Sequence, residues 1–294
     1  MKQLLLYIAL VFMFVACRKE VVFKTSNSQV ALVVDAILTN DSLFMIKLSQ
    51  TQAINDNSLN KFVSNATIEV FDVDSNIISV LSYLKDGQYV SNLVKAVPNE
   101  AYIFKISHQN NVFWANQAMP DTLKTKILDT SRLLFQGVSQ FFQIKYDLQD
   151  KSQLKNYYGL KIKAVFESIN NQDTTLLTEW LPIETNEFVL VQDANFKFSK
   201  TNLLFSDQYF NGQNTILNFG CANLFNNPNK KIKYLVVYSS SLSVAAYQFF
   251  ASMNEHQFYQ NDPFSLPPPL QGNVAGAYGG VVAQYMKADT VRFK

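Results

Sequence analysis

Apolar and polar side chains alternate over most of this chain, and this two-residue period constrains the fold more than any other feature. Val34, Ala36 and Leu38 fall on one face of a first expected strand, and Ile46 and Leu48 fall on one face of the next. Successive side chains of a strand point to opposite faces of a sheet, so this pattern is typical of strands with one buried and one wet face. It predicts an all-β protein.

The first part of the chain, residues 30–118, predicts a β-sandwich. About seven short alternating segments lie there, separated by turn signals such as Asp86-Gly87. Short strands with turns at regular intervals are typical of sandwiches of immunoglobulin or transthyretin type. Met119-Pro120 is the expected boundary, because proline lacks the N–H that a central strand donates.

The second part, residues 119–294, is expected to form another β-rich domain. Alternation is clean over 142–148 and 158–166, and we expect these two segments to pair as antiparallel neighbours joined across 149–157. Further strands are expected around four other segments, which are 176–180, 187–191, 215–219 and 232–238.

One segment of the second domain lacks the two-residue period and predicts an α-helix at about 243–260. It contains no glycine or proline, and Ser241 or Ser243 can cap its start. Several of its residues recur at helical spacing, which favours a packing face over a ligand site. That face comprises Tyr247, Phe250, Ala251, Asn254 and Phe258. The prolines at 267–269 and the glycines within 272–280 then predict a long irregular loop.

The start of the chain resembles a bacterial lipoprotein signal. Lys2 supplies a positive charge, residues 4–14 are apolar, and the small Ala16 precedes Cys17. A run of about a dozen apolar residues is too short for a bilayer core that needs roughly 20, and it is typical of a cleaved signal. We therefore expect residues 1–16 to be removed, Cys17 to carry lipid, and residues 17–29 to form a tether. The alternatives are a plain secretory signal or an apolar segment that happens to contain a cysteine.

Composition argues against nucleic-acid binding and against an internal disulfide bond. The net charge is +2 and basic residues gather only in short pieces such as 230–233, so we expect no nucleic-acid binding. Hydrophobic residues make up 48% of the chain, which is enough for a packed core. Once Cys17 carries lipid, only Cys221 remains, and its apolar neighbours predict a buried, unreactive thiol.

The sequence offers little catalytic chemistry, and we expect no enzymatic activity, no cofactor and no metal. It contains no His-Glu-x-x-His, Cys-x-x-Cys or Gly-x-Ser-x-Gly motif. His108 is expected at a strand rim and His256 on the solvent face of the helix. An uncharacterised hydrolase is the least favoured alternative, and its candidate carboxylates are Glu179 with Glu184 or Glu187.

Two short aromatic stretches supply the candidate binding residues. Tyr209-Phe210 and Tyr278 are expected to expose rings on which a glycan or peptide stacks. Asp207 is expected to organise the adjacent loop through Asn211-Gly212, because Asp and Asn side chains bond nearby backbone amides in turns. The alternative is a calcium ion bound by the oxygens of Asp207 and Asn211, although no complete calcium-loop pattern is present.

Several stretches of the mature chain follow one another in a characteristic order. They are Arg18-Lys19-Glu20, 32–39, 65–70, 87–89, Asp150 with 156–158, 205–212, the helix with Tyr247, 262–264, 272–274 and Gly279-Gly280. In this order they resemble the outer-membrane lipoproteins of Bacteroidota that are catalogued as domain-of-unknown-function family 4249. The resemblance implies an outer-membrane protein whose genes often neighbour those of TonB-dependent transporters. It implies no catalytic residues.

We therefore expect a non-enzymatic lipoprotein of the outer membrane, anchored through Cys17, that serves as an accessory or binding partner of a TonB-dependent transporter or another outer-membrane complex. The alternative is a surface protein that binds a glycan or peptide through Tyr209, Phe210 or Tyr278. Residues 18–20 leave both the periplasmic and the surface face open as locations.

Overall fold

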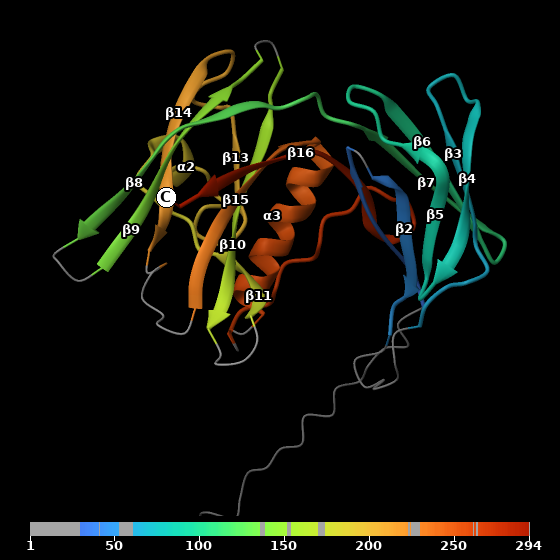
Figure 1. Cartoon of the computed structure of the whole chain (residues 1–294). Helices are drawn as coiled ribbons and strands as arrows, with labels where there is room; N and C mark the ends of the chain where they lie inside the picture. The colour runs from blue at the N-terminus through green and yellow to red at the C-terminus, as the bar shows by residue number, and fades with distance from the viewer. Residues whose placement is uncertain are drawn as a thin grey trace, which may run out of the picture.

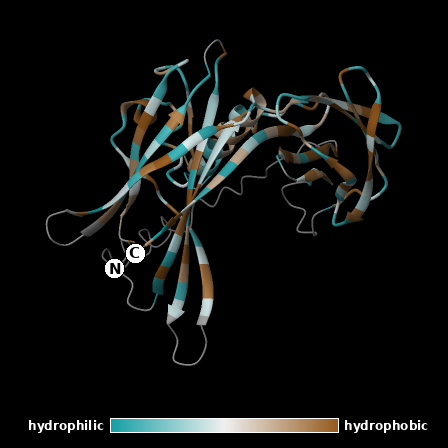
Figure 2. Cartoon of the chain, turned by 45° about the horizontal axis from the view of Figure 1, so that its top comes forward, coloured by the Kyte–Doolittle hydropathy of each residue, from teal (hydrophilic) through white to brown (hydrophobic). Residues whose placement is uncertain are grey.

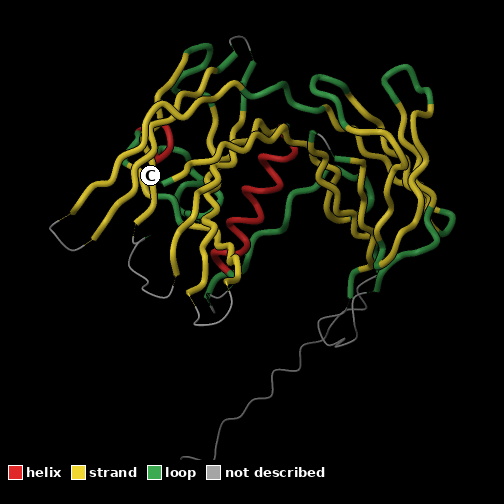
Figure 3. Tube along the Cα trace, in the orientation of Figure 1, coloured by secondary structure: helices red, strands yellow, loops and turns green. Residues whose placement is uncertain are grey.

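The expected all-β fold with one principal helix is confirmed (Figures 1 and 3). Cys17 and the whole of residues 1–29 lie outside the described residues, so the expected signal, lipid site and tether are not part of the structure. No helix among the described residues is long and apolar enough to cross a membrane. The computed structural model describes residues 30–40, 42–52, 61–135, 139–151, 154–169, 174–222, 224, 230–260, 262 and 264–293.

Seven strands form most of the first lobe, as the alternation predicts. In Figure 2, hydrophobic and hydrophilic residues follow one another along the strands. The strands are β1 (Leu32–Thr39), β2 (Leu43–Gln50), β3 (Thr67–Phe71), β4 (Ile77–Lys85), β5 (Gln88–Lys95), β6 (Ala101–His108) and β7 (Asn111–Ala118).

These strands wrap into two layers around one core. Their order within the sheet is β1-β2-β5-β4-β3-β6-β7, so the sheet folds over until β2 faces β6. The Phe44 ring lies 5.0 Å from Tyr102 and 5.8 Å from Phe104 in edge-on contacts. Buried side chains from both layers, including Ile68 and Tyr89, complete this core.

Within the described residues, the second lobe contains nine more strands and two helices. The strands are β8 (Lys124–Phe135), β9 (Ser139–Gln149), β10 (Tyr157–Ile169), β11 (Thr174–Leu181), β12 (Glu184–Thr185), β13 (Leu203–Ser206), β14 (Asn214–Ala222), β15 (Lys230–Leu242) and β16 (Tyr278–Arg292). The helices are α2 (Phe188–Val191) and α3 (Val244–Tyr259).

Two sheets face each other in this lobe. A four-stranded sheet, β12-β14-β9-β8, packs on β11-β10-β15-β16, and the Tyr146 hydroxyl donates to Ser239 Oγ across the core at 2.7 Å. The predicted pairing of 142–148 with 158–166 is therefore wrong. Strand β9 pairs with β8 on one edge and with β14 on the other, whereas β10 pairs with β11, β13 and β15. The two segments meet through their buried faces instead of their backbones.

Two other expectations are corrected. Residues 187–191 do not form a strand, because Phe188–Val191 make a single helical turn. The irregular loop expected beyond the prolines ends earlier than its glycines suggest, since β16 begins at Tyr278. The sequence did contain a strand signal there in the apolar run Val281-Val282-Ala283.

Strand β16 joins the two lobes. Its first half pairs in parallel with β1, from Tyr278 opposite Val33 to Gln284 opposite Thr39. Its second half pairs antiparallel with β15, ending with Arg292 opposite Tyr234. The 12-stranded sheet consequently runs through both lobes. Side chains of β16 also enter both cores, because Val281 and Ala283 belong to the first and Val291 to the second.

Helix α3 lies in the angle between the two lobes (Figure 1). The expected cap is confirmed, since Ser243 Oγ accepts a hydrogen bond from the Ala246 N–H at 3.1 Å. Ala246 and Phe250 pack against Leu204, Leu242 and Val282, on the sheet face opposite the second core. Of the predicted face, Phe250 and Asn254 are buried, whereas Phe258 is exposed.

Gly279 is required where β16 crosses β1. Its φ is +78°, and an added Cβ would lie 2.1 Å from the Val34 carbonyl oxygen. We expect Gly279→Ala to lower the free energy of unfolding by at least about 2 kcal/mol, through backbone strain and loss of the β1 contact. Thermal and urea unfolding measure this. Gly159→Ala is the matched control, because its Cβ makes ordinary contacts of 3.7 Å or more. Equal stability of the two variants contradicts the assignment.

Candidate functional site

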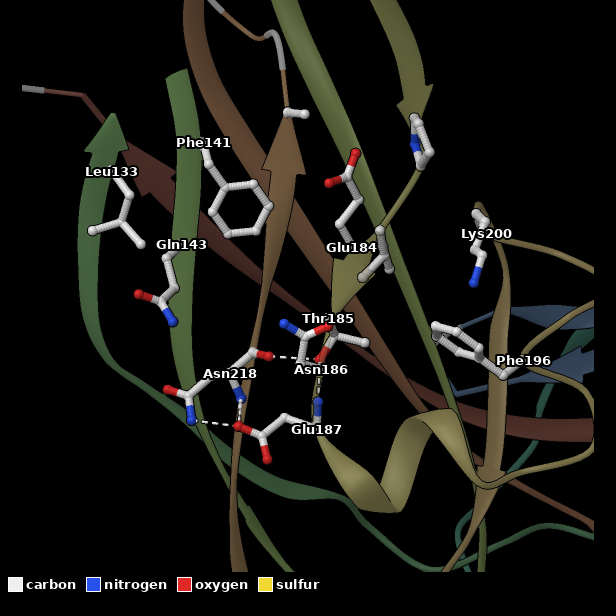
Figure 4. Close-up of a pocket in the computed structure, with 13 residues that line it drawn as sticks. Leu133, Phe141, Gln143, Glu184, Thr185, Asn186, Glu187, Phe196, Lys200 and Asn218 are labelled. Atoms are coloured by element: carbon white, nitrogen blue, oxygen red, sulfur yellow. Dashed lines mark hydrogen bonds between the residues drawn. The ribbon is translucent and has the colours of Figure 1, made fainter. Parts of the chain in front are cut away.

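An open groove of about 1060 Å³ lies on the second lobe, along the outer face of the four-stranded sheet (Figure 4). Strands β8, β9, β12 and β14 line it together with the segment that follows β12. The side chains combine carboxylates, amides, a lysine and aromatic rings; they include Leu133, Phe141, Gln143, Glu184, Thr185, Asn186, Glu187, Phe196, Lys200 and Asn218.

The groove is hollow because one strand presents small residues to it. On β14, Gly220 and Ala222 lie opposite Gln143 and Phe141 of β9. A Cβ on Gly220 would lie 2.0 Å from the Phe142 carbonyl oxygen and 2.8 Å from the Phe141 ring, so only glycine fits there. The neighbouring long side chains therefore form walls around a floor of backbone.

Hydrogen bonds fix the polar end of the groove. Glu187 Oε1 accepts from the backbone N–H of Asn218 at 3.1 Å and also from its side-chain amide. The Thr185 hydroxyl donates to the Asn218 carbonyl at 2.7 Å and accepts from the Glu187 N–H at 3.0 Å (Figure 4). These contacts hold the carboxylate and the amide in one arrangement, which is typical of a binding surface with preset polar groups.

A cation and a second carboxylate occupy the other wall. Lys200 Nζ lies 3.1 Å from the Phe196 ring centroid. Loss of hydration lowers the pKa of Lys200, and the negative charge of Glu184 opposes that shift.

Burial raises the pKa of the Cys221 thiol, on the core side of this sheet, to about 12, and the charge of Glu184 adds to the shift. The prediction that Cys221 is buried is confirmed.

An exposed aromatic pair includes the residue that follows Glu187 in the chain. Phe188 follows Glu187 directly in the chain, and its ring lies 5.0 Å from that of Tyr209 in an edge-on contact. Both rings are exposed. Tyr209, one of the predicted binding residues, is therefore exposed as expected and contacts the residue next to Glu187, although neither ring belongs to the groove lining.

The Asp207 side chain bonds Asn156 instead of Asn211-Gly212, through which it was expected to organise the loop. Its carboxylate is buried and accepts from the Asn156 backbone N–H at 2.7 Å and from the Asn156 side chain at 3.2 Å. Gly212 donates its N–H to Asp150 at 2.6 Å instead of to Asp207, and the Tyr158 hydroxyl also donates to Asp150. Burial raises the pKa of Asp207, and the charge of Asp150 adds to the shift.

The other predicted binding residues lie in three different environments. Phe210 is only 4% exposed and its ring stacks on Tyr158, so the expectation of an exposed stacking ring is wrong at this position. Its side chain fills the second core because the turn at 207–213 folds back onto β10. Asn211 is exposed at the tip of that turn. Tyr278 is 63% exposed but lies at the start of β16 in the first lobe, away from the groove.

His108 lies at a strand end as expected, whereas His256 differs from expectation. His108 is buried at the end of β6, and neither ring nitrogen has a hydrogen-bond partner among the described residues. His256 Nδ1 lies 2.9 Å from the Pro268 carbonyl oxygen, so the ring contacts the proline segment instead of pointing freely into solvent. Among the described residues, no group of three or more His, Cys, Asp or Glu side chains is placed to hold a metal ion.

Sequence reasoning missed most of the groove. Glu184 and Glu187 were candidates only as catalytic carboxylates, and Gln143, Asn218 and Phe188 were not singled out. Alternation does place Gln143 and Asn218 on the wet faces of their strands. That signal does not distinguish a groove from ordinary solvent exposure, because the groove depends on which strands are neighbours.

A second surface lies on the outer face of the first lobe, across β4, β3, β6 and β7. Its apolar members, here called the Trp114 face, are Phe71, Ile77, Val80, Ile103, Val112 and Trp114. Four of them are exposed, and Phe71 and Trp114 rings lie 6.3 Å apart. An ion pair between Lys105 Nζ and Glu69 Oε2, 2.7 Å long, lies in the middle of this face.

Comparisons with known proteins identify one family. The family described as "Domain of unknown function (DUF4249)" matches residues 18–287. No curated protein matches the chain. Among solved structures, a chain described as "Biofilm associated protein - BSP domain" is 8% identical with a TM-score of 0.18. The match covers 90% of this chain and 60% of that one, and at this TM-score it carries no argument.

The buried charge of Asp207 predicts a pH-dependent stability. Because its folded-state pKa is raised, its contribution to stability is fully present below about pH 4 and is lost as pH rises through the folded pKa. Asp207→Asn removes the charge and keeps an acceptor for Asn156. We expect the stability of this variant relative to the parent to increase between about pH 4 and pH 7 in urea unfolding.

Asp207→Ala is the control for the hydrogen bonds. It leaves the Asn156 backbone N–H without its acceptor, while the Asn156 side chain keeps its bonds to the Lys151 and Leu154 carbonyls. We expect this loss to cost about 1–3 kcal/mol of stability. If the difference in unfolding free energy between Asp207→Asn and the parent is the same at both pH values, the electrostatic account is contradicted.

Proposed function

The chain belongs to the DUF4249 family, and from this premise we propose that it is a non-enzymatic lipoprotein of the bacterial outer membrane that acts as an accessory of an outer-membrane complex. Lipid on Cys17 holds the two-lobed body at the membrane. The partner is a TonB-dependent transporter or a comparable outer-membrane protein. The Bacteroidota lipoproteins that the sequence resembles share this setting.

The Trp114 face is the observation that carries this proposal. Soluble domains rarely expose large contiguous apolar patches, and such patches mark sites of protein interaction. Exposed Trp114 shares its face of β7 with Val112, and its ring lies near that of Phe71, which is paired with Ile77. An exposed tryptophan of this kind is the aromatic centre that dominates interface energetics. The Glu69–Lys105 pair supplies directional polar contacts within the same face.

Mutation of this aromatic centre tests the proposal. We expect Trp114→Ala to weaken co-purification of the native protein with its outer-membrane partner by about thirtyfold, the loss typical of an interface hot spot. Pull-down from gently solubilised membranes measures it. Trp180→Ala is the matched control, because Trp180 is 46% exposed against 47% for Trp114 but lies on the other lobe. Recovery of the parent protein as a lone monomer overturns the proposal.

A second candidate function is binding of a glycan, or of an extended peptide, in the groove. The Phe188–Tyr209 pair carries this candidate, because exposed rings beside fixed amides and carboxylates suit a ligand with both apolar faces and hydroxyl groups. Asn218, Glu187 and Gln143 then serve as hydrogen-bonding groups for that ligand. The groove is separate from the Trp114 face, so both functions fit one molecule.

A glycan array tests the second candidate. We expect the parent protein to bind a restricted set of oligosaccharides, and Tyr209→Ala to reduce that binding by about tenfold through loss of ring stacking. Tyr278→Ala is the control, since Tyr278 is exposed but lies in the first lobe. An array without binders, or binding that Tyr209→Ala leaves unchanged, removes glycan binding from consideration.

A further inference from the structure

The described chain begins at one end of the first lobe, and several segments meet there. The Thr51 N–H donates to the Ala31 carbonyl at 2.9 Å, and the Gln50 N–H donates to the Lys61 carbonyl at 2.9 Å. The Leu48 N–H donates to the Gly87 carbonyl at 2.8 Å, and a Cβ added to Gly87 would lie 3.3 Å from Phe62 Cβ. The start of β1, the end of β2 and the turn between β4 and β5 therefore share this end.

Apolar side chains are exposed at this end of the lobe. Val33 lies opposite Tyr278 on one side and Ser49 on the other, and Ser49 bridges to Phe62. Tyr278 and Phe62 therefore lie in one row on one face, about 14 Å apart across neighbouring strands. Leu84 precedes the turn after β4, and Val30 precedes β1. All four are exposed, and we call them the Phe62 end: Val30, Phe62, Leu84 and Tyr278.

Positive charge accompanies these apolar side chains. Lys47 Nζ lies 4.9 Å from the Phe62 ring centroid, and Lys61 and Lys85 are exposed beside it. Among the described carboxylates, Asp35 lies opposite Lys47 in the β1–β2 register and Asp86 lies in the turn between β4 and β5. A surface that combines aromatic and aliphatic residues with lysines suits the boundary between lipid headgroups and acyl chains.

We propose that the Phe62 end contacts the membrane surface directly, with Phe62, Leu84 and Tyr278 among the headgroups and the lysines against anionic phosphates. This inference rests on the lipid anchor of the proposed function. Residues 17–29 span at most about 45 Å when extended, and they join the described chain at Val30, within this end. The anchor thus delivers this end to the bilayer first. A second, weaker attachment fixes the orientation of the lobes, which lipid on a tether alone leaves free.

Vesicle sedimentation without the anchor tests the contact. The mature chain with Cys17→Ser keeps every described residue and lacks the lipid. We expect it to bind vesicles of phosphatidylethanolamine containing one quarter phosphatidylglycerol, and to bind them less well at high salt. Phe62→Glu and Leu84→Glu each reduce binding by about tenfold. Ile77→Glu is the control, because Ile77 is exposed on the Trp114 face, and thermal unfolding verifies that each variant is folded.

The outcomes separate this contact from the anchor itself. Equal binding by the Phe62→Glu, Leu84→Glu and Ile77→Glu variants overturns the contact, as does the absence of vesicle binding by the Cys17→Ser chain. Neither result affects the proposed anchor, which mass spectrometry of the native mature chain tests separately through the mass of its first residue. A bare Cys17 overturns the anchor and with it the orientation inferred here.

Discussion

The pairing of β16 with two different strands is the constraint on which the rest of the structure depends. Parallel pairing with β1 closes the first lobe, and antiparallel pairing with β15 extends the sheet of the second. One continuous backbone ladder therefore sets the angle between the lobes, and α3 packs into that angle against Val282. A domain boundary near residue 119 assigns every later residue to the second lobe. Residues within 274–283 nevertheless pack into the core of the first lobe.

Polar contacts reinforce this arrangement at the positions that carry the family resemblance. Asp150 and Asp207 join the stretch around Tyr158 to the turn at 207–213, through bonds to Tyr158, Gly212 and Asn156. Asn273 does the same beside β16: its side chain accepts from the Val281 N–H at 2.8 Å and donates to its carbonyl at 2.7 Å. Most buried polar groups in proteins are hydrogen-bonded, and the bonds made by these residues fix the geometry of the loops they join.

The sequence predicts burial well and strand partners poorly. Alternation identified the seven strands of the first lobe, and helical spacing with Ser243 identified α3, because both depend on local geometry. The partners of β9 and β10 depend on distant segments, so adjacency in the chain was misleading there. The glycines within 272–280 predicted a loop where β16 begins. Gly279 instead lies within the strand, where it allows the close approach of β1. The groove was missed for the same non-local reason.

The position of β16 has a consequence for the order of folding. Asn40 and Met286 are joined by two hydrogen bonds although 246 positions separate them in the chain. The residues around Asn40 thus lack their final neighbour until those around Met286 have been synthesised. Contacts of such long range slow folding and leave the early segments incomplete meanwhile. The edge of β1 therefore stays unpaired until β16 has been synthesised, and loss of β16 would remove the one strand that pairs with both β1 and β15 among the described residues.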